Sequence, residues 1–109
     1  MSSLKDLTAD IICIYKLKDC PVTSAYELKD AISIAQKILN PGEKLISPAE
    51  ELDDSWIFFV ENSKYEGKII IGDGPYVINK KNTQYGSINY PTYFAFAENA
   101  KKVPFTTDV

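Results

Sequence analysis

The sequence predicts an α+β fold in which an amphipathic helix packs on an antiparallel meander sheet of about four to five strands. Three observations support this fold: one segment has apolar residues at helical spacing, one strand is apolar on both faces, and several short strand-like runs are separated by tight turns. At 109 residues, with 45% hydrophobic and 25% charged residues, the chain is expected to form one domain, 1–109. Such a domain can bury a core without disulfides or metals.

The helix is expected to begin near Ser24 and to end before Pro41. Ser24 and Glu27 have the spacing of a capping box, in which a hydroxyl and a carboxylate accept hydrogen bonds from free N–H groups at a helix start. Proline cannot continue a helix and Gly42 tolerates the backbone reversal that follows, so Asn40-Pro41-Gly42 ends it. Its apolar stripe comprises Leu28, Ala31, Ile32, Ala35, Ile38 and Leu39. We expect this stripe to lie on the sheet or on another helix.

The segment Trp56–Val60 is predicted to be a central strand of the sheet. Trp56 and Phe58 alternate with Ile57 and Phe59, so both faces of the strand are apolar and both need cover. The helix is expected to cover one face, and the N-terminal segment or a partner the other. Further strands are expected at residues 43–47, 68–71, 76–79 and about 85–89, with Ser47-Pro48 closing the first and short hairpins joining the later ones.

Additional helices are expected at both ends of the chain. Apolar residues from Leu4 to Leu17 follow helical spacing, but Ile12–Tyr15 is also good strand material, so helix or strand stays open for residues 8–17. A short C-terminal helix is expected over Thr92–Lys102. The first residues lack a basic region followed by an unbroken apolar run, so we expect no signal peptide and a cytoplasmic location.

The composition argues against several classes of function. The chain has no His, all twelve basic residues are Lys, and the net charge is -3, which disfavours binding to nucleic acid. Without His, a Ser or Thr nucleophile lacks its commonest base, so we expect no enzyme, no cofactor and no metal. Pro75 removes an N–H from the Gly72-Asp73-Gly74-Pro75 loop and a strand follows it, so a hairpin is expected there and not a phosphate-binding loop.

The two cysteines, Cys13 and Cys20, match neither a redox pair nor a zinc-ligand set. We expect Cys13 to be buried and Cys20 to be exposed at a turn, although a bridge between them stays open.

A run of acidic residues precedes the central strand and is expected to be an exposed loop. Its members are Glu50, Glu51, Asp53 and Asp54. Such a run is most often simply solvated, but it also fits contact with a basic partner, and it lacks the alternating ligands and glycine of a calcium loop. We expect these four residues to contact a partner.

Tyrosines concentrate in the C-terminal half of the chain. Tyrosine offers a large contact area and a hydroxyl at little cost in entropy, which is why it is frequent at protein interfaces, although several of these rings could instead fill the core. The candidates for partner contact are Tyr65, Tyr85, Tyr90 and Tyr93.

Four motifs follow one another over residues 22 to 90: an amphipathic helix, an acidic loop, the strand Trp-Ile-Phe-Phe-Val from Trp56, and the run Gly-Asp-Gly-Pro-Tyr-Val-Ile-Asn-Lys from Gly72. This order resembles the immunity protein 35 family and the related YrhB-like domain. Gly86 matches the final turn a few residues late, and Asn79 stands where the family commonly has Asp.

The resemblance implies a bacterial antitoxin that binds a cognate toxin domain, one with a basic surface, and neutralises it by occlusion. It carries over no catalytic residue. The alternative that it implies is a YrhB-like chaperone or stress-related domain that binds non-native clients. No membrane or nucleic-acid partner is expected in either case.

Overall fold

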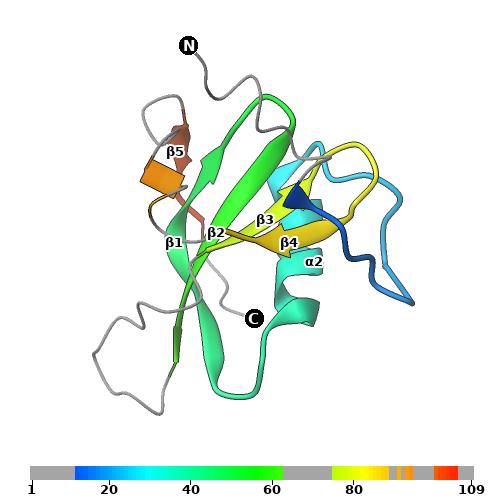
Figure 1. The fold of residues 1–109 in the computed structure, drawn as a ribbon, viewed down its shortest axis with the longest axis horizontal. Helices are drawn as coiled ribbons and strands as arrows, with labels where there is room; N and C mark the ends of the chain where they lie inside the picture. The colour runs from blue at the N-terminus through cyan, green and yellow to red at the C-terminus, as the bar shows by residue number, and fades with distance from the viewer. Residues whose placement is uncertain (1–11, 63–74, 89–90, 92, 95–99, 106–109) are drawn as a thin grey trace.

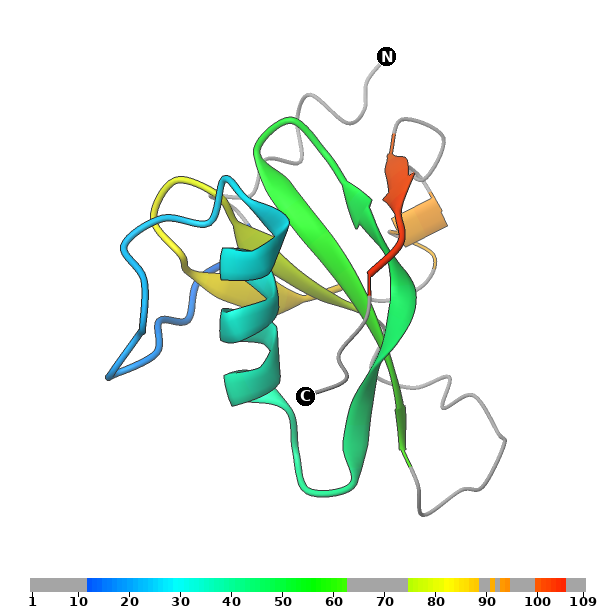
Figure 2. The same ribbon diagram turned by 180° about the vertical axis from the view of Figure 1, so that it is seen from behind.

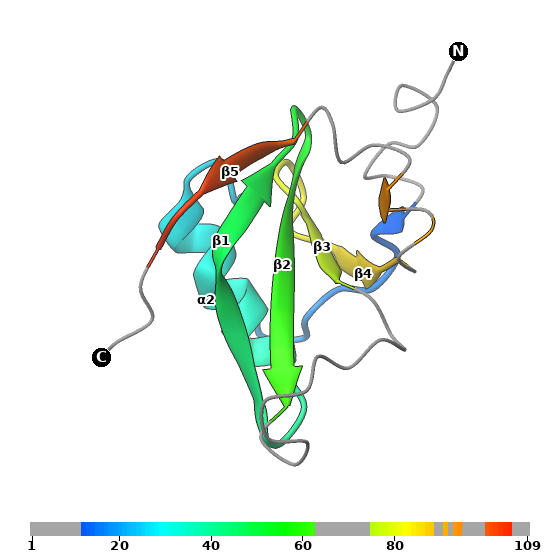
Figure 3. The ribbon, with the colours of Figure 1, turned by 90° about the vertical axis from the view of Figure 1, so that its left-hand side faces the viewer.

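The computed structural model describes residues 12–62, 75–88, 91, 93–94 and 100–105, and in them one helix packs on a five-stranded sheet. The elements are α2 (Leu28–Ile38), β1 (Glu43–Glu51), β2 (Ser55–Asn62), β3 (Tyr76–Asn79), β4 (Tyr85–Ser87) and β5 (Lys101–Val103). The strand order is β4-β3-β2-β1-β5 and every pair is antiparallel. Figure 1 shows the elements, and Figure 3 shows α2 behind the row of strands. The α+β prediction is confirmed.

The helix is one turn shorter than the capping-box spacing predicts. It begins at Leu28 with Glu27 as N-cap, and no side chain caps it. Ser24 does not start the helix because the neighbouring Ala25 is fixed by the sheet: its N–H donates to the Lys80 carbonyl at 2.7 Å, and its carbonyl accepts from the Trp56 indole at 2.8 Å. The predicted stop is confirmed, with Gly42 at φ 89°.

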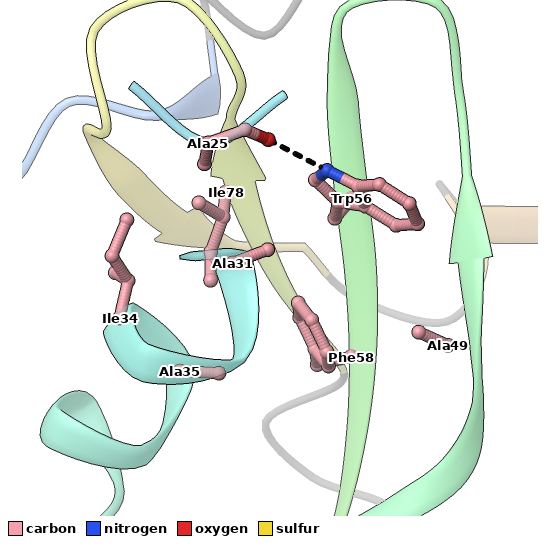
Figure 4. Close-up of a cluster of buried hydrophobic side chains, with 8 residues drawn as sticks. All are labelled: Ala25, Ala31, Ile34, Ala35, Ala49, Trp56, Phe58 and Ile78. Carbon is pink, nitrogen blue, oxygen red and sulfur yellow. Dashed lines mark hydrogen bonds between the residues drawn. The ribbon is translucent and has the colours of Figure 1, made fainter. Parts of the chain in front are cut away.

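The predicted central position of β2 is also confirmed, because it pairs with β1 on one side and β3 on the other. One face of the sheet carries a cluster with the helix, and Figure 2 shows α2 lying across that face. The buried members are Ala25, Ala31, Ile34, Ala35, Ala49, Trp56, Phe58 and Ile78 (Figure 4). Ile34, which the predicted stripe omits, is thus a central core residue of the helix.

The opposite face carries a second, smaller cluster. Its buried members are Cys13, Ile57, Val77, Ile88 and Tyr93. The N-terminal segment therefore supplies part of the second cover that the apolar strand requires. Cys13 is buried as expected, whereas Cys20 is half-buried against the helix-side cluster, and both are free thiols.

Strand β1 continues past the point where Ser47-Pro48 was expected to close it. The Ser47–Pro48 peptide is cis, and the pairing with β2 shifts between Ile46 and Glu50. Proline is tolerated at such an irregularity because no ladder hydrogen bond requires its missing N–H. The rest of β1, Ala49–Glu51, pairs with β5 from the far end of the chain.

The two additional helices are not among the elements of the described residues. Residues 13–17 are not helical, since Tyr15 forms a β-bridge with Tyr85; the first eleven residues lie outside the described part. Pro91, Tyr93 and Phe94 have helical backbone, but Lys101–Val103 form β5, so the predicted helix does not reach Lys102. Pairing with β1 determines this outcome, and no local pattern signals it. The predicted strand 68–71 and Gly72–Gly74 also lie outside the described residues.

Candidate functional site

The four acidic residues occupy the end of β1 and the turn into β2, and they do not form one exposed loop. Glu50 and Glu51 are the last residues of β1 and pair with Ile57 and Trp56 of β2. This corrects the expectation of an exposed loop from Ala49 to Asp54. The reason is long-range: the pairing of β5 with this stretch extends β1 beyond its proline.

Glu50 is only 5% exposed and lies on the face opposite the helix. Both of its carboxylate oxygens accept from the Tyr93 hydroxyl, at 2.8 and 2.9 Å. The Tyr93 ring is itself buried and packs edge-on against Phe59, with 5.3 Å between ring centroids. A buried carboxylate needs hydrogen-bond donors, and Tyr93 supplies one. Two residues predicted to contact a partner thus contact each other within the fold.

Glu51 points to the helix side and forms an ion pair with Lys80. The Lys80 ammonium lies 2.7 Å from a Glu51 carboxylate oxygen and 5.2 Å from the centroid of the Trp56 ring. The backbone of Lys80 also donates to the Asp54 carbonyl at 3.0 Å. The ammonium is almost fully buried, so the pair and the cation–π contact hold the β3–β4 turn on the sheet. The contacts of Lys80 with Glu51 and Trp56 therefore stabilise the fold.

The lysines of β5 lie opposite the acidic residues of β1. Glu50 pairs with Lys102 and Glu51 with Lys101, and directly opposed residues share a face of the sheet. The strand register thereby puts a lysine opposite each of these two carboxylate residues. The turn from β1 into β2 is closed by the Leu52 N–H, which donates to the Ser55 carbonyl at 2.9 Å. The two acidic residues within this turn, Asp53 and Asp54, are exposed.

Tyr85 is half-buried in β4 and contacts Tyr15 of the N-terminal segment. The Tyr15 N–H donates to the Tyr85 carbonyl at 2.9 Å, and the Tyr85 N–H donates to the Tyr15 carbonyl at 2.8 Å. The two rings lie 5.8 Å apart by their centroids. Tyr65 and Tyr90 lie outside the described residues. Of the predicted tyrosines that the structure describes, Tyr85 contacts Tyr15 and Tyr93 contacts Glu50, so both are engaged within the fold.

Sequence reasoning missed the large apolar side chains that the structure exposes. These are Ile14 (63% exposed), Tyr15 (58%), Tyr26 (62%) and Phe94 (66%). Tyr15 is distinctive because two backbone hydrogen bonds and a ring contact hold it in place while most of its surface stays accessible. We call Tyr15 together with Tyr85 the Tyr15 patch. The strand-like run Ile12–Tyr15 was the available signal, but the pattern did not show which side chains face outward.

An open hollow of about 360 Å³ lies between the end of α2 and the start of β1. Its lining residues are Gln36, Leu39, Glu43, Lys44 and Leu45. The Glu43 carboxylate accepts from the Tyr76 hydroxyl at 3.0 Å and from the Asn40 N–H at 2.7 Å, so it fixes this corner of the fold. Within the described ranges, no group of three or more Cys, Asp or Glu side chains could hold a metal ion, and no helix is long and apolar enough to cross a membrane.

Comparison with protein-family models found no match to this chain, and comparisons with curated proteins and with solved structures found none either.

Proposed function

We propose that this protein is a bacterial immunity protein that binds a cognate toxin domain and neutralises it by occlusion. The proposal rests on the resemblance over residues 22 to 90 and on the absence of His and Arg from the sequence. The observation that carries it furthest is the geometry of Tyr15, a residue that is 58% exposed although its backbone N–H and carbonyl are both hydrogen-bonded to Tyr85.

An aromatic ring fixed in this way is suited to anchor a protein partner. Binding normally costs free energy because side chains and loops must become ordered, and a ring already held by its backbone and by Tyr85 avoids much of that cost. Tyr is also frequent among the few residues that supply most of the affinity at an interface. The neighbouring Ile14, 63% exposed, adds apolar surface to the same segment.

Electrostatics would act mainly on the rate of association. The chain carries a net charge of -3, and Asp53 and Asp54 are exposed in the β1–β2 turn. Negative surface charge attracts a basic toxin domain and increases its association rate, an effect that weakens as salt is added. Because Glu50 and Glu51 are engaged within the fold, we assign this role to the two aspartates. In this proposal the protein acts in the cytoplasm, without a cofactor.

The test is co-expression with the toxin domain encoded by the neighbouring gene, together with a measured dissociation constant for the purified pair. We expect the protein to protect cells, and Tyr15→Ala to weaken binding by about 30-fold, which corresponds to about 2 kcal/mol. Tyr26→Ala is the matched control, since Tyr26 is equally exposed but lies outside the Tyr15 patch. No binding and no protection would reject the function. Protection with an unchanged affinity for Tyr15→Ala would place the contact elsewhere.

The alternative, a YrhB-like chaperone that binds non-native clients, is favoured by the four exposed apolar side chains. Client binding uses accessible apolar surface without a fixed partner. It predicts that the protein suppresses aggregation of several unrelated unfolded proteins, and that alanine at Ile14 and at Phe94 reduces this effect. Binding to one partner at fixed stoichiometry, with no effect on unfolded proteins, would reject it.

A further inference from the structure

Residues 12–22 form a strap that crosses the outer edge of β4 from one face of the sheet to the other. At its start, Cys13 is buried in the cluster opposite the helix, and its thiol donates to the Val77 carbonyl at 3.3 Å. Further along, Leu17, Cys20 and Val22 pack against the cluster on the helix side. Figure 1 shows the strap in blue beside β4, which is the last strand of the sheet at that edge.

The strap fits over β4 because residue 86 is glycine. A Cβ atom at Gly86 would lie 2.2 Å from the Ile12 carbonyl oxygen and 3.1 Å from the Ile12 carbonyl carbon. Both atoms belong to the backbone, so the strap itself would have to move to accommodate a methyl group. Gly86 lies in the middle of β4, which corrects the expectation that it forms a final turn.

The edge that the strap covers is suited to pair with another strand. In β4, Gly86 pairs inward with Val77, while the Tyr85 N–H and C=O point outward and bind Tyr15. Backbone groups alternate in direction along an antiparallel strand, so those of Ser87 point outward like those of Tyr85. An exposed edge of this kind is a template for pairing with another chain unless something covers it.

We infer that the β4 edge is a latent pairing site for a second copy of this chain, and that the strap keeps it closed. The edge is self-complementary. In an antiparallel pair of two β4 strands centred on Gly86, Tyr85 lies opposite Ser87 of the second copy, and Ser87 opposite its Tyr85. Each opposed pair exchanges two hydrogen bonds, and the two copies of residue 86 meet at the two-fold axis as a non-hydrogen-bonded pair, which accommodates alanine as well as glycine. This inference is independent of the proposed function.

Gly86→Ala tests the inference because it displaces the strap without removing a β3–β4 hydrogen bond. In a Cys20→Ser background, the rate at which a disulfide reagent modifies Cys13, which is 1% exposed, reports whether the strap has moved. Sedimentation velocity over a range of concentrations reports the oligomeric state. Ser87→Ala, at an exposed neighbouring position, is the matched control.

We expect Gly86→Ala to increase the labelling rate of Cys13 at least tenfold and to form a dimer at high concentration, while the control behaves as the parent protein. Tyr15→Pro is the second variant, for the case that Gly86→Ala does not fold. It removes the N–H that donates to Tyr85 and leaves β4 itself unchanged. Faster labelling with a monomer at all concentrations would overturn the inference. So would unchanged labelling in both variants, or irregular aggregates in place of a dimer.

Discussion

The two faces of the sheet are built in different ways. On the helix side, one short stretch of α2 contributes three buried residues that pack in a cluster with Trp56 and Phe58. These residues are Ala31, Ile34 and Ala35. On the other side, the cover comes from separate segments, represented by Cys13, Ile88 and Tyr93. That side also buries a carboxylate, Glu50, among its apolar neighbours.

This difference indicates which kind of substitution should destabilise each face of the sheet. The helix side consists of close-packed apolar side chains, so its stability depends on volume and shape. The opposite side depends on single contacts between segments distant in sequence, among them the hydrogen bond between Tyr93 and Glu50. We therefore expect truncation to cost most on the helix side, whereas loss of a polar partner should be the characteristic weakness of the opposite side.

Phe58→Ala should have the largest effect. Phe58 is fully buried and meets Phe105 edge-on, with 5.9 Å between ring centroids. Truncation of a buried Phe leaves a cavity and should cost about 3–5 kcal/mol of unfolding free energy, measured by urea denaturation. Tyr26→Ala, at an exposed position, should change stability by less than about 0.5 kcal/mol. If Phe58→Ala lowers the unfolding free energy no more than Tyr93→Phe does, the proposed difference between the two faces is wrong.

Tyr93→Phe should cost about 2 kcal/mol, because it removes a hydroxyl donor from the buried Glu50 carboxylate. The same measurement on Glu50→Met combined with Tyr93→Phe should recover much of this loss, since neither polar group then remains to be satisfied. If the double variant is no more stable than Tyr93→Phe, packing and not hydrogen bonding determines the stability of this face.

Lys80→Met should have the smallest of the three effects, about 1 kcal/mol. It keeps the aliphatic stem near Trp56 but removes the charge that pairs with Glu51. Loss of a partner from a buried ion pair costs more, but the Glu51 side chain is 32% exposed, so water compensates part of the loss. Trp56 fluorescence provides a local readout. An unchanged emission spectrum and unchanged stability would show that the cation contributes nothing to the helix side.

Much of the fold could be predicted because its signals are local. The helix, its stop at Pro41-Gly42, the two apolar faces of β2 and the strand Tyr76–Asn79 all follow from periodicity and turn residues within a few positions. The strand β5 could not be predicted, because two of the three residues in Lys101–Val103 are lysines and the run is too short to show an alternating pattern. It forms since β1 offers an edge to which those three residues can pair.

The candidate site was predicted less well, for a related reason. A run of carboxylates is predicted to be exposed when its neighbours in space are unknown. In the structure, however, Glu50 accepts a hydrogen bond from Tyr93, 43 positions away, and Glu51 pairs with Lys80, 29 positions away. The same limit applies to Tyr15, whose exposure depends on a contact with Tyr85. Only Asp53 and Asp54, in the β1–β2 turn, are exposed as the local pattern indicates.

The sequence by itself determined the class of fold, the amphipathic helix and the requirement that β2 be covered on both faces, because hydrophobic periodicity is a property of neighbouring residues. Only the tertiary structure decided which carboxylates are buried, which aromatic rings reach solvent and why Gly86 must be glycine. Each of these depends on a backbone or side chain that the sequence places far away, and burial, pairing and close approach are set by distance in space.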